Sequence, residues 1–335
     1  MVISHKSERS VWLLAGLILL LSLSSCHYDR LFPQSGGEDG SVTAKAVSFH
    51  ATLMDDDVAT RGIPVDGQDY PDGQSFGVLG YELPKGTWET TLTPDFMYNF
   101  KITHSKNQYT YENTKLWPYQ RVRFFAYHPY ATTDNDIVPS DSDFAGDPYL
   151  QFRVKNSVLN QIDLLLSATE PVLAPPVVSF SFAHALTRIE FFVKKAPIPE
   201  DVRISAILLK NIIGAGRVSL VPRIDGRFSW QPSSDPDDIK EYVLGASSLN
   251  GVDRGLIPIE LQNITDTDYT PVCSPNGTLF LIPQPIIPEN SYLIVTYFLN
   301  DEERKQIIPL PATLPGGANE WLSGKYIRYQ LTITP

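Results

Sequence analysis

The sequence predicts an all-β protein made of two antiparallel β-sandwich domains in tandem. Apolar and polar residues alternate over many short segments, which is the two-residue period of a strand with one buried face. Clusters of Pro, Gly, Asn and Asp, such as Pro275-Asn276-Gly277, separate these segments as turns do. Few stretches carry a helical period, so the pattern does not fit a parallel sheet with alternating helices. The 335 residues are enough for two domains of ordinary size.

The N-terminus predicts an export signal over residues 1–25. Lys6 and Arg9 precede the apolar run 11–21, which is too short to span a bilayer and is followed by small residues before Cys26. The stretch 23–26, Leu-Ser-Ser-Cys, resembles the lipobox of bacterial lipoproteins, which implies cleavage before Cys26 and acylation of its thiol. The alternative is an ordinary signal peptide with an incidental cysteine. Residues 26–44 are polar and glycine-rich, and we expect a flexible tether there.

We expect the first sandwich over residues 45–172 and the second over 173–335. The boundary falls near residues 171–176, whose three prolines cannot serve a central strand. The alternating or β-branched segments that predict strands are 47–53, 76–81, 96–103, 122–128, 149–154, 162–166, 177–182, 187–194, 203–209, 278–283, 292–299 and 326–334. Residues 231–275 are rich in loop signals, and no strand is assigned within them.

Composition and motifs argue against several classes of function. The net charge is −11 with no basic run, so the chain lacks the phosphate-neutralising surface of a nucleic-acid partner. The six histidines show no metal-ligand spacing, and the chain has no nucleophile elbow. The stretch 214–217, Gly-Ala-Gly-Arg, lacks a third glycine and a following helix, so it indicates a bend or a hairpin and not a phosphate-binding loop. We therefore expect no metal, no cofactor and no enzymatic activity.

Aromatic residues concentrate in the predicted first sandwich. They could stack on sugar rings, as in an adhesin, or serve as half-buried strand residues, and the second interpretation is favoured. The residues concerned are Tyr109, Tyr111, Trp117, Tyr119, Tyr127 and Tyr130.

Several segments follow the lipobox at Cys26 and together cover nearly the whole mature chain: 47–53 (VSFHATL), 59–62 (ATRG), 123–129 (RFFAYHP), 163–168 (DLLLSA), 180–189 (FSFAHALTRI) and 321–329 (WLSGKYIRY). In their order, these segments resemble the fimbrillin-like family of gut and oral Gram-negative bacteria.

This resemblance implies two transthyretin-like sandwiches and a structural fimbrial subunit. The subunit would reach the outer membrane and the cell surface as a lipid-anchored precursor. An Arg-specific protease would cut the Arg61-Gly62 bond and release the first strand, 47–53. The open groove would then accept a strand from another fimbrial subunit, which is donor-strand complementation. The alternatives are a monomeric lipoprotein adhesin that binds glycans and, less favoured, a surface hydrolase.

The last strand is the candidate donor. Ile327, Tyr329, Leu331 and Ile333 form one apolar face of the segment 326–334. Such a strand can fill a groove in a neighbour or close its own sandwich, and both interpretations remain open.

Overall fold

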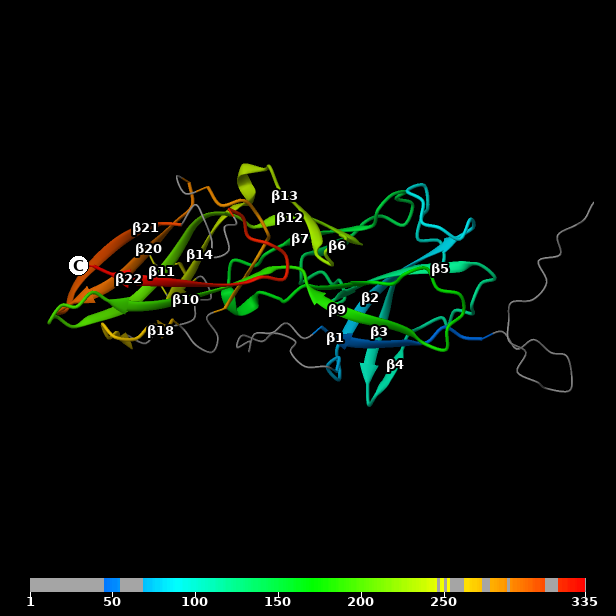
Figure 1. The fold of residues 1–335 in the computed structure, drawn as a ribbon, viewed down its shortest axis with the longest axis horizontal. Coiled ribbons are helices and arrows are strands. Elements are labelled where there is room, and N and C mark those ends of the chain that lie inside the picture. Colours follow the sequence, from blue (N-terminus) through cyan, green and yellow to red (C-terminus); the bar gives the residue numbers. More distant parts are fainter. Residues whose placement is uncertain are drawn as a thin grey trace, which may run out of the picture. The chain divides into compact units, whose positions relative to one another are not determined.

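Strands and turns make up the described chain (Figure 1), which confirms the all-β prediction. The computed structural model describes residues 45–54, 69–245, 248–249, 252–253, 262–272, 278–287, 290–310 and 319–334. Within these ranges the helical segments are two short 3₁₀ turns, η1 (Val158–Asn160) and η2 (Pro236–Asp238). The described residues all belong to the unit Ala44–Pro335. Cys26, Arg61 and Gly62, the predicted lipid and cleavage positions, lie outside the described residues.

The largest sheet has seven strands in the order β1-β9-β8-β5-β2-β3-β4. Neighbouring strands in it are antiparallel except β1 and β9, which are parallel. In sheet order the strands are β1 (Phe49–Leu53), β9 (Val178–His184), β8 (Leu165–Ala168), β5 (Arg121–His128), β2 (Ser75–Leu83), β3 (Met97–Ser105) and β4 (Gln108–Thr110).

The other described strands form three further sheets and a short hairpin. One sheet has the order β13 (Phe228–Pro232), β12 (Ala215–Pro222), β7 (Tyr149–Arg153), β6 (Ile137–Pro139). A second has the order β14 (Ile239–Gly245), β11 (Val202–Ile213), β20 (Tyr292–Leu299), β21 (Glu302–Pro309), with β17 (Gln262–Asn263) also paired to β11. In the third, β10 (Thr187–Lys195) pairs with β18 (Thr270–Pro271), β19 (Leu279–Leu281) and β22 (Tyr326–Ile333). The hairpin joins β15 (Ser248–Leu249) and β16 (Val252–Asp253).

Where the sequence alternation predicts a strand, the predicted bounds agree with the observed ones to within a few residues. Strands β4, β6, β12 to β18 and β21 are not among the predicted segments, and the strand expected over 162–166 runs over 165–168 instead. Gly214 alone separates β11 from β12, which belong to different sheets, and residues 215–217, where a bend or hairpin was expected, lie within β12. A Cβ on Gly214 would lie 2.7 Å from the hydroxyl of Tyr242 and from Cγ of Lys240, so a larger residue there would have to displace these side chains. Strand β9 follows the expected domain boundary yet lies in the seven-stranded sheet, and the division at residue 172 stays a prediction.

The central strands β2 and β5 are buried on both faces of the seven-stranded sheet. One face contributes Phe76 and Phe124 to a cluster that we call the aromatic core. The other face contributes Leu79 and Phe125 to a second, larger cluster. Double burial explains why residues 124–127, Phe-Phe-Ala-Tyr, run without polar alternation. The aromatic core comprises Val47, Phe49, Ala51, Leu53, Tyr70, Phe76, Val78, Phe96, Met97, Ile102, Val122, Phe124, Ala126, Leu165, Val178, Phe180 and Phe182.

Candidate functional site

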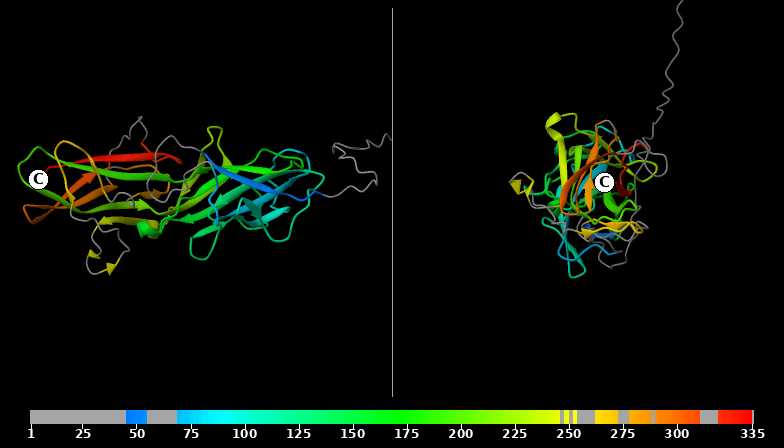
Figure 2. Two further views of the ribbon diagram at one scale, coloured as in Figure 1. Left: turned by 90° about the horizontal axis from the view of Figure 1, so that it is seen from below. Right: turned by 90° about the vertical axis from the view of Figure 1, so that its left-hand side faces the viewer.

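Strand β1 is an edge strand that nevertheless supplies part of the core. It lies beside β9 (Figures 1 and 2) in a parallel register that sets Phe49 opposite Val178 and Leu53 opposite Phe182. Phe49, Ala51 and Leu53 are 4%, 1% and 7% exposed, whereas His50 between them faces solvent. The strand therefore has the one-sided burial that its sequence predicts.

The opposite edge of β1 is held by side chains from the far edge of the same sheet. The hydroxyl of Tyr109, in β4, donates a hydrogen bond to the carbonyl oxygen of Ala51 at 3.0 Å. The hydroxyl of Tyr111 donates to the carbonyl oxygen of Val47 at 2.8 Å. Just before β1, the amide of Val47 donates to the carbonyl of Lys115 at 2.9 Å. The two edges of the seven-stranded sheet therefore meet at β1, which closes the sheet around the aromatic core.

Phe49 is the main anchor of β1 in this core. Its ring lies 5.5 Å from that of Tyr111 and 5.9 Å from those of Phe124 and Phe180, centroid to centroid. Burying an aromatic or aliphatic side chain of this size stabilises a fold by ~1.5–3 kcal/mol. Loss of β1 would therefore expose these rings to water.

The described ends of the connection from β1 to β2 are both anchored. The amide of Met54 donates to the carbonyl of Phe182 at 2.8 Å, and Thr52 forms an isolated bridge with Asp69. Tyr70, 1% exposed, fixes the chain again inside the aromatic core. Between these two anchor points lie residues 55–68, which the structure does not describe and which include Arg61 and Gly62.

The predicted donor strand, β22, is also a parallel edge strand. It pairs with β10 over eight residue pairs, from Arg188 opposite Tyr326 to Lys195 opposite Ile333. Tyr329, Leu331 and Ile333 are buried and Ile327 is half-buried, while Arg328, Gln330 and Thr332 are exposed. The expected apolar face thus exists, and in this structure it fills the protein's own core.

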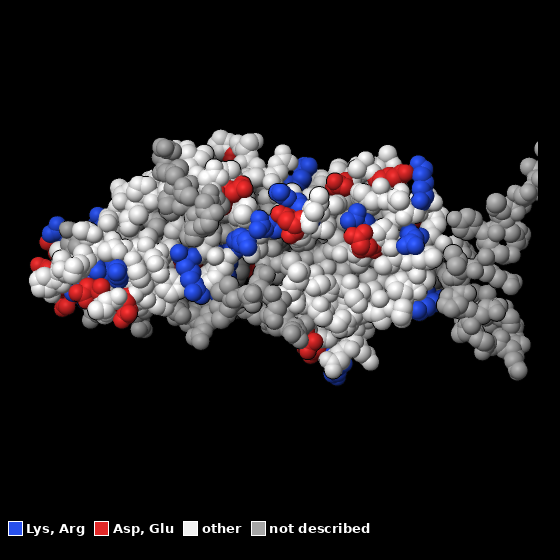
Figure 3. Space-filling model, viewed as in Figure 1, with Lys and Arg blue, Asp and Glu red and all other residues white. Residues whose placement is uncertain are grey.

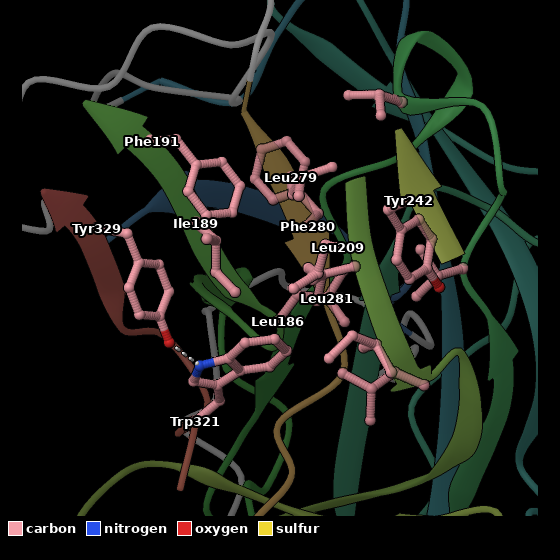
Figure 4. Packing of buried hydrophobic residues seen from close by; sticks show 14 of the residues in the cluster. Leu186, Ile189, Phe191, Leu209, Tyr242, Leu279, Phe280, Leu281, Trp321 and Tyr329 are labelled. Carbon is pink, nitrogen blue, oxygen red and sulfur yellow. Dashed lines mark hydrogen bonds between the residues drawn. The ribbon is translucent and has the colours of Figure 1, made fainter. Parts of the chain in front are cut away.

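Tyr329 is the most specifically held residue of β22 (Figure 4). Its ring stacks on Phe191 of β10 with centroids 5.6 Å apart. The indole nitrogen of Trp321 donates to the hydroxyl of Tyr329 at 2.9 Å, and both side chains are buried. Burial raises the pKa of Tyr329 to about 12, so the hydroxyl remains protonated at neutral pH. The apolar alternation of residues 326–334 predicts that Tyr329 is buried, but it does not indicate that Trp321 is its hydrogen-bond partner.

The first residue of β22 is held by hydrogen bonds centred on a carboxylate of β10. Glu190 of β10 accepts hydrogen bonds from Tyr326, from Arg188 at 2.7 Å and from Thr278 at 2.8 Å. The hydrogen bonds from Tyr326 and Arg188 outweigh burial and hold the pKa of Glu190 below its usual value. The Arg188 guanidinium lies 4.5 Å from the centre of the Tyr326 ring. This cluster fixes where β22 begins on β10.

Most of the aromatic concentration noted in the sequence is structural. Tyr109, Tyr111 and Trp117 pack against the aromatic core, and Tyr127 is fully buried. Tyr130 is half-buried, whereas Tyr119 is 89% exposed. The tyrosines therefore form no sugar-stacking platform as a group.

The surface seen in Figure 3 carries interspersed positive and negative side chains, without a large patch of one sign. Among the described residues, no three His, Cys, Asp or Glu side chains are grouped as metal ligands. The described part of the chain contains no helix with the length and hydropathy to cross a membrane.

Comparison with known proteins identifies relatives of this fold. The chain is 30% identical over 151 residues to fimbrium subunit Fim1C of Phocaeicola vulgatus, and the match covers 40% of each chain. A fimbrial protein from Bacteroides vulgatus has a similar structure, with a TM-score of 0.58 and 20% identity over 86% of this chain and 95% of the other. A candidate cell adhesion protein from Bacteroides uniformis has a TM-score of 0.50 and 16% identity over 86% of this chain and 94% of the other.

The sequence profile described as fimbrillin-like matches residues 60–335. This range contains every described strand except β1. The chain belongs to the fimbrillin-like family.

Proposed function

We propose that this protein is a structural subunit of a surface fimbrium that polymerises by exchange of its edge strands. Family membership and the fimbrial relatives support a fimbrial or adhesive role at the cell surface. The proposal of strand exchange rests on one observation: β1 is an edge strand and at the same time part of the core. Among the described strands it pairs only with β9, as an edge strand does, and yet it closes the aromatic core.

Cleavage at Arg61-Gly62 would convert β1 into a separate peptide. After the cut, non-covalent contacts hold β1 in its groove, among them the ladder to β9, the bridge from Thr52 to Asp69, the two tyrosine hydroxyls and three buried side chains. An incoming strand can replace the backbone contacts, because backbone hydrogen bonding along a sheet edge does not depend on sequence, and apolar residues at every second position can replace the buried side chains. Exchange therefore needs no rearrangement of the other strands.

The C-terminal strand β22 is the donor in this proposal. It pairs with β10 alone, so it can leave without dividing a sheet. It prefers a parallel partner, as β1 does, and it offers apolar side chains at every second position. A neighbour's β22 could thus adopt the place of β1 in the same orientation.

Cys26 provides the membrane attachment of the precursor in this proposal. One acyl chain gives only marginal binding, but a lipoprotein cysteine carries several, which makes attachment stable. The partners are then the outer membrane, other fimbrial subunits and an Arg-specific protease.

Limited digestion with a trypsin-like protease tests the proposal. We expect the first cut after Arg61, release of the β1 peptide, and ladders of the purified protein on denaturing gels run without heating. Arg61→Gln should abolish both the cut and the ladders, whereas Arg304→Gln, at an exposed position of β21, should change neither. A first cut elsewhere, or loss of β1 with no ladder, would contradict strand exchange and favour a monomeric lipoprotein adhesin.

A further inference from the structure

A pocket of about 430 Å³ lies on the outward face of the sheet β13-β12-β7-β6. Its volume falls within the ~300–1,000 Å³ of small-molecule sites. The strand register builds one wall, because Val138, Gln151, Arg217 and Gln231 stand directly beside one another on the four strands. All four are exposed, and we call them the polar row after the three polar members, Gln151, Arg217 and Gln231.

The floor of the pocket is made of small residues. Ala215 lies two positions before Arg217 on β12, on the same face, and Gly216 follows it. A Cβ on Gly216 would lie 2.9 Å from the carbonyl oxygen of Gln231, so close approach of β12 and β13 requires glycine there. The hollow is therefore a built feature of the strand packing.

Ion pairs fix the wall opposite the polar row. Arg153 pairs with Asp238, a carboxylate whose side chain is 9% exposed. Hydrogen bonding to Ser233 and the ion pair to Arg153 keep the pKa of Asp238 below its usual value. Each charge of this pair therefore has an opposite charge within the protein, as does Asp136, which also lines the pocket and pairs with Lys155.

Arg217 is the cation of the pocket that remains available. Its guanidinium lies 4.0 Å from the centre of the Tyr149 ring, which fixes the orientation of its plane. Among the described residues, no carboxylate forms an ion pair with Arg217. A guanidinium held in this way presents its fork of N–H donors to a planar carboxylate.

The amides of Gln151 and Gln231 flank Arg217 on the two neighbouring strands. Each amide offers both a donor and an acceptor, which is what sugar hydroxyls require. Val138 and the small floor offer apolar surface to the C–H groups of a ring. We propose that this pocket binds a carboxylated saccharide, with the carboxylate on Arg217 and the ring hydroxyls on the two glutamines. The fimbrial subunit would then itself carry a glycan-binding site, independently of strand exchange.

Methyl glucuronide and methyl glucoside are matched probes, because they differ only in the carboxylate. We expect saturation-transfer NMR and shift titration of the full chain to detect the glucuronide and to find the glucoside bound more than about tenfold more weakly. Arg217→Gln should weaken glucuronide binding to the same extent. Ala215→Leu should abolish it by filling the floor without changing any charge.

Two controls make the result specific. Arg304→Gln removes an exposed arginine far along the sequence on β21 and should leave binding unchanged. Circular dichroism should show all three variants folded. The proposal is overturned if glucuronide and glucoside bind alike, if Arg217→Gln binds as the wild type does, or if acetate competes as well as the glucuronide. Equal competition by acetate would leave only a carboxylate site without sugar recognition.

Discussion

Two pairs of buried polar side chains contact each other within the core. The hydroxyl of Tyr70 and Nδ1 of His128 lie 2.7 Å apart inside the aromatic core, as Trp321 and Tyr329 are paired beneath β22. Leaving one partner of such a pair unsatisfied costs ~1–3 kcal/mol. Each pair thus selects one arrangement of an otherwise apolar core, and each lies next to a terminal strand.

His128 should make the stability of the fold depend on pH. Burial lowers its pKa from 6.5 to about 4, which the charge of Asp163 only partly offsets. In the unfolded chain the histidine protonates near pH 6.5, so between pH 6.5 and 4 the unfolded state binds more protons. The free energy of unfolding is therefore highest, as far as His128 is concerned, above pH 6.5. It decreases as the pH falls from 6.5 toward 4, by about 1.4 kcal/mol per pH unit.

Urea unfolding of the wild type and of His128→Gln at several pH values in this window measures the effect. The variant should have a shallower dependence of its unfolding free energy on pH. His50→Gln replaces a solvent-exposed histidine and serves as the control. Identical slopes for the wild type and His128→Gln would show that His128 does not carry the dependence.

The two terminal strands are held by consecutive elements of the chain. Strand β1 pairs in parallel with β9, and β22 pairs in parallel with β10. Only Ala185 and Leu186 separate β9 from β10. In the proposed assembly, the acceptor for an incoming strand is thus joined by a two-residue connection to the strand that holds the donor.

The tyrosine hydroxyls should control how firmly β1 is held. Tyr109→Phe with Tyr111→Phe removes the hydrogen bonds to the carbonyls of Ala51 and Val47 but keeps the rings in place. Each such bond contributes ~0.5–1.5 kcal/mol, so exchange of the β1 amides with deuterium should become about tenfold faster. The matched control is Tyr130→Phe, which removes a hydroxyl that donates to the carbonyl oxygen of Asn99 at 3.3 Å. Unchanged β1 protection in the double variant would mean that the β9 ladder alone holds the strand.

Sequence alternation predicts strands well where one face is buried and poorly elsewhere. β1 and β22 were predicted because their buried and exposed residues alternate. β21 was missed because residues 302–305 are all exposed and charged, as suits an edge strand, so no apolar period remains. The parallel pairing and the targets of Tyr109 and Tyr111 depend on which strands meet in the fold. A local sequence pattern does not show which strands are neighbours, and for the same reason the sequence does not predict the pocket beside Arg217.

For the whole molecule, the proposed strand exchange depends on the inward face of β22. Leu331→Asp with Ile333→Asp should abolish polymer ladders, because a charge forced into an apolar groove costs several kcal/mol unless it is neutralised or paired. Gln330→Asp with Thr332→Asp adds the same charges at exposed positions of the same strand and should leave ladders intact.

Circular dichroism distinguishes the two roles of β22. A folded, ladder-free Leu331→Asp/Ile333→Asp variant supports the donor role. Collapse of the fold would show that β22 is a closing strand of its own body. Normal ladders from this variant would eliminate β22 as the donor.

The parallel pairing of the terminal strands also determines how a fimbrium would bear tension. If a neighbour's strand takes the place of β1 on β9, traction pulls the guest strand by its N-terminal end and pulls β9 by its C-terminal end, through β10. In a parallel pair these are opposite ends of the ladder, so the hydrogen bonds are loaded together in shear and do not peel open one after another. A filament joined in this way would resist drag along its axis more strongly than one whose ladder peels open from one end.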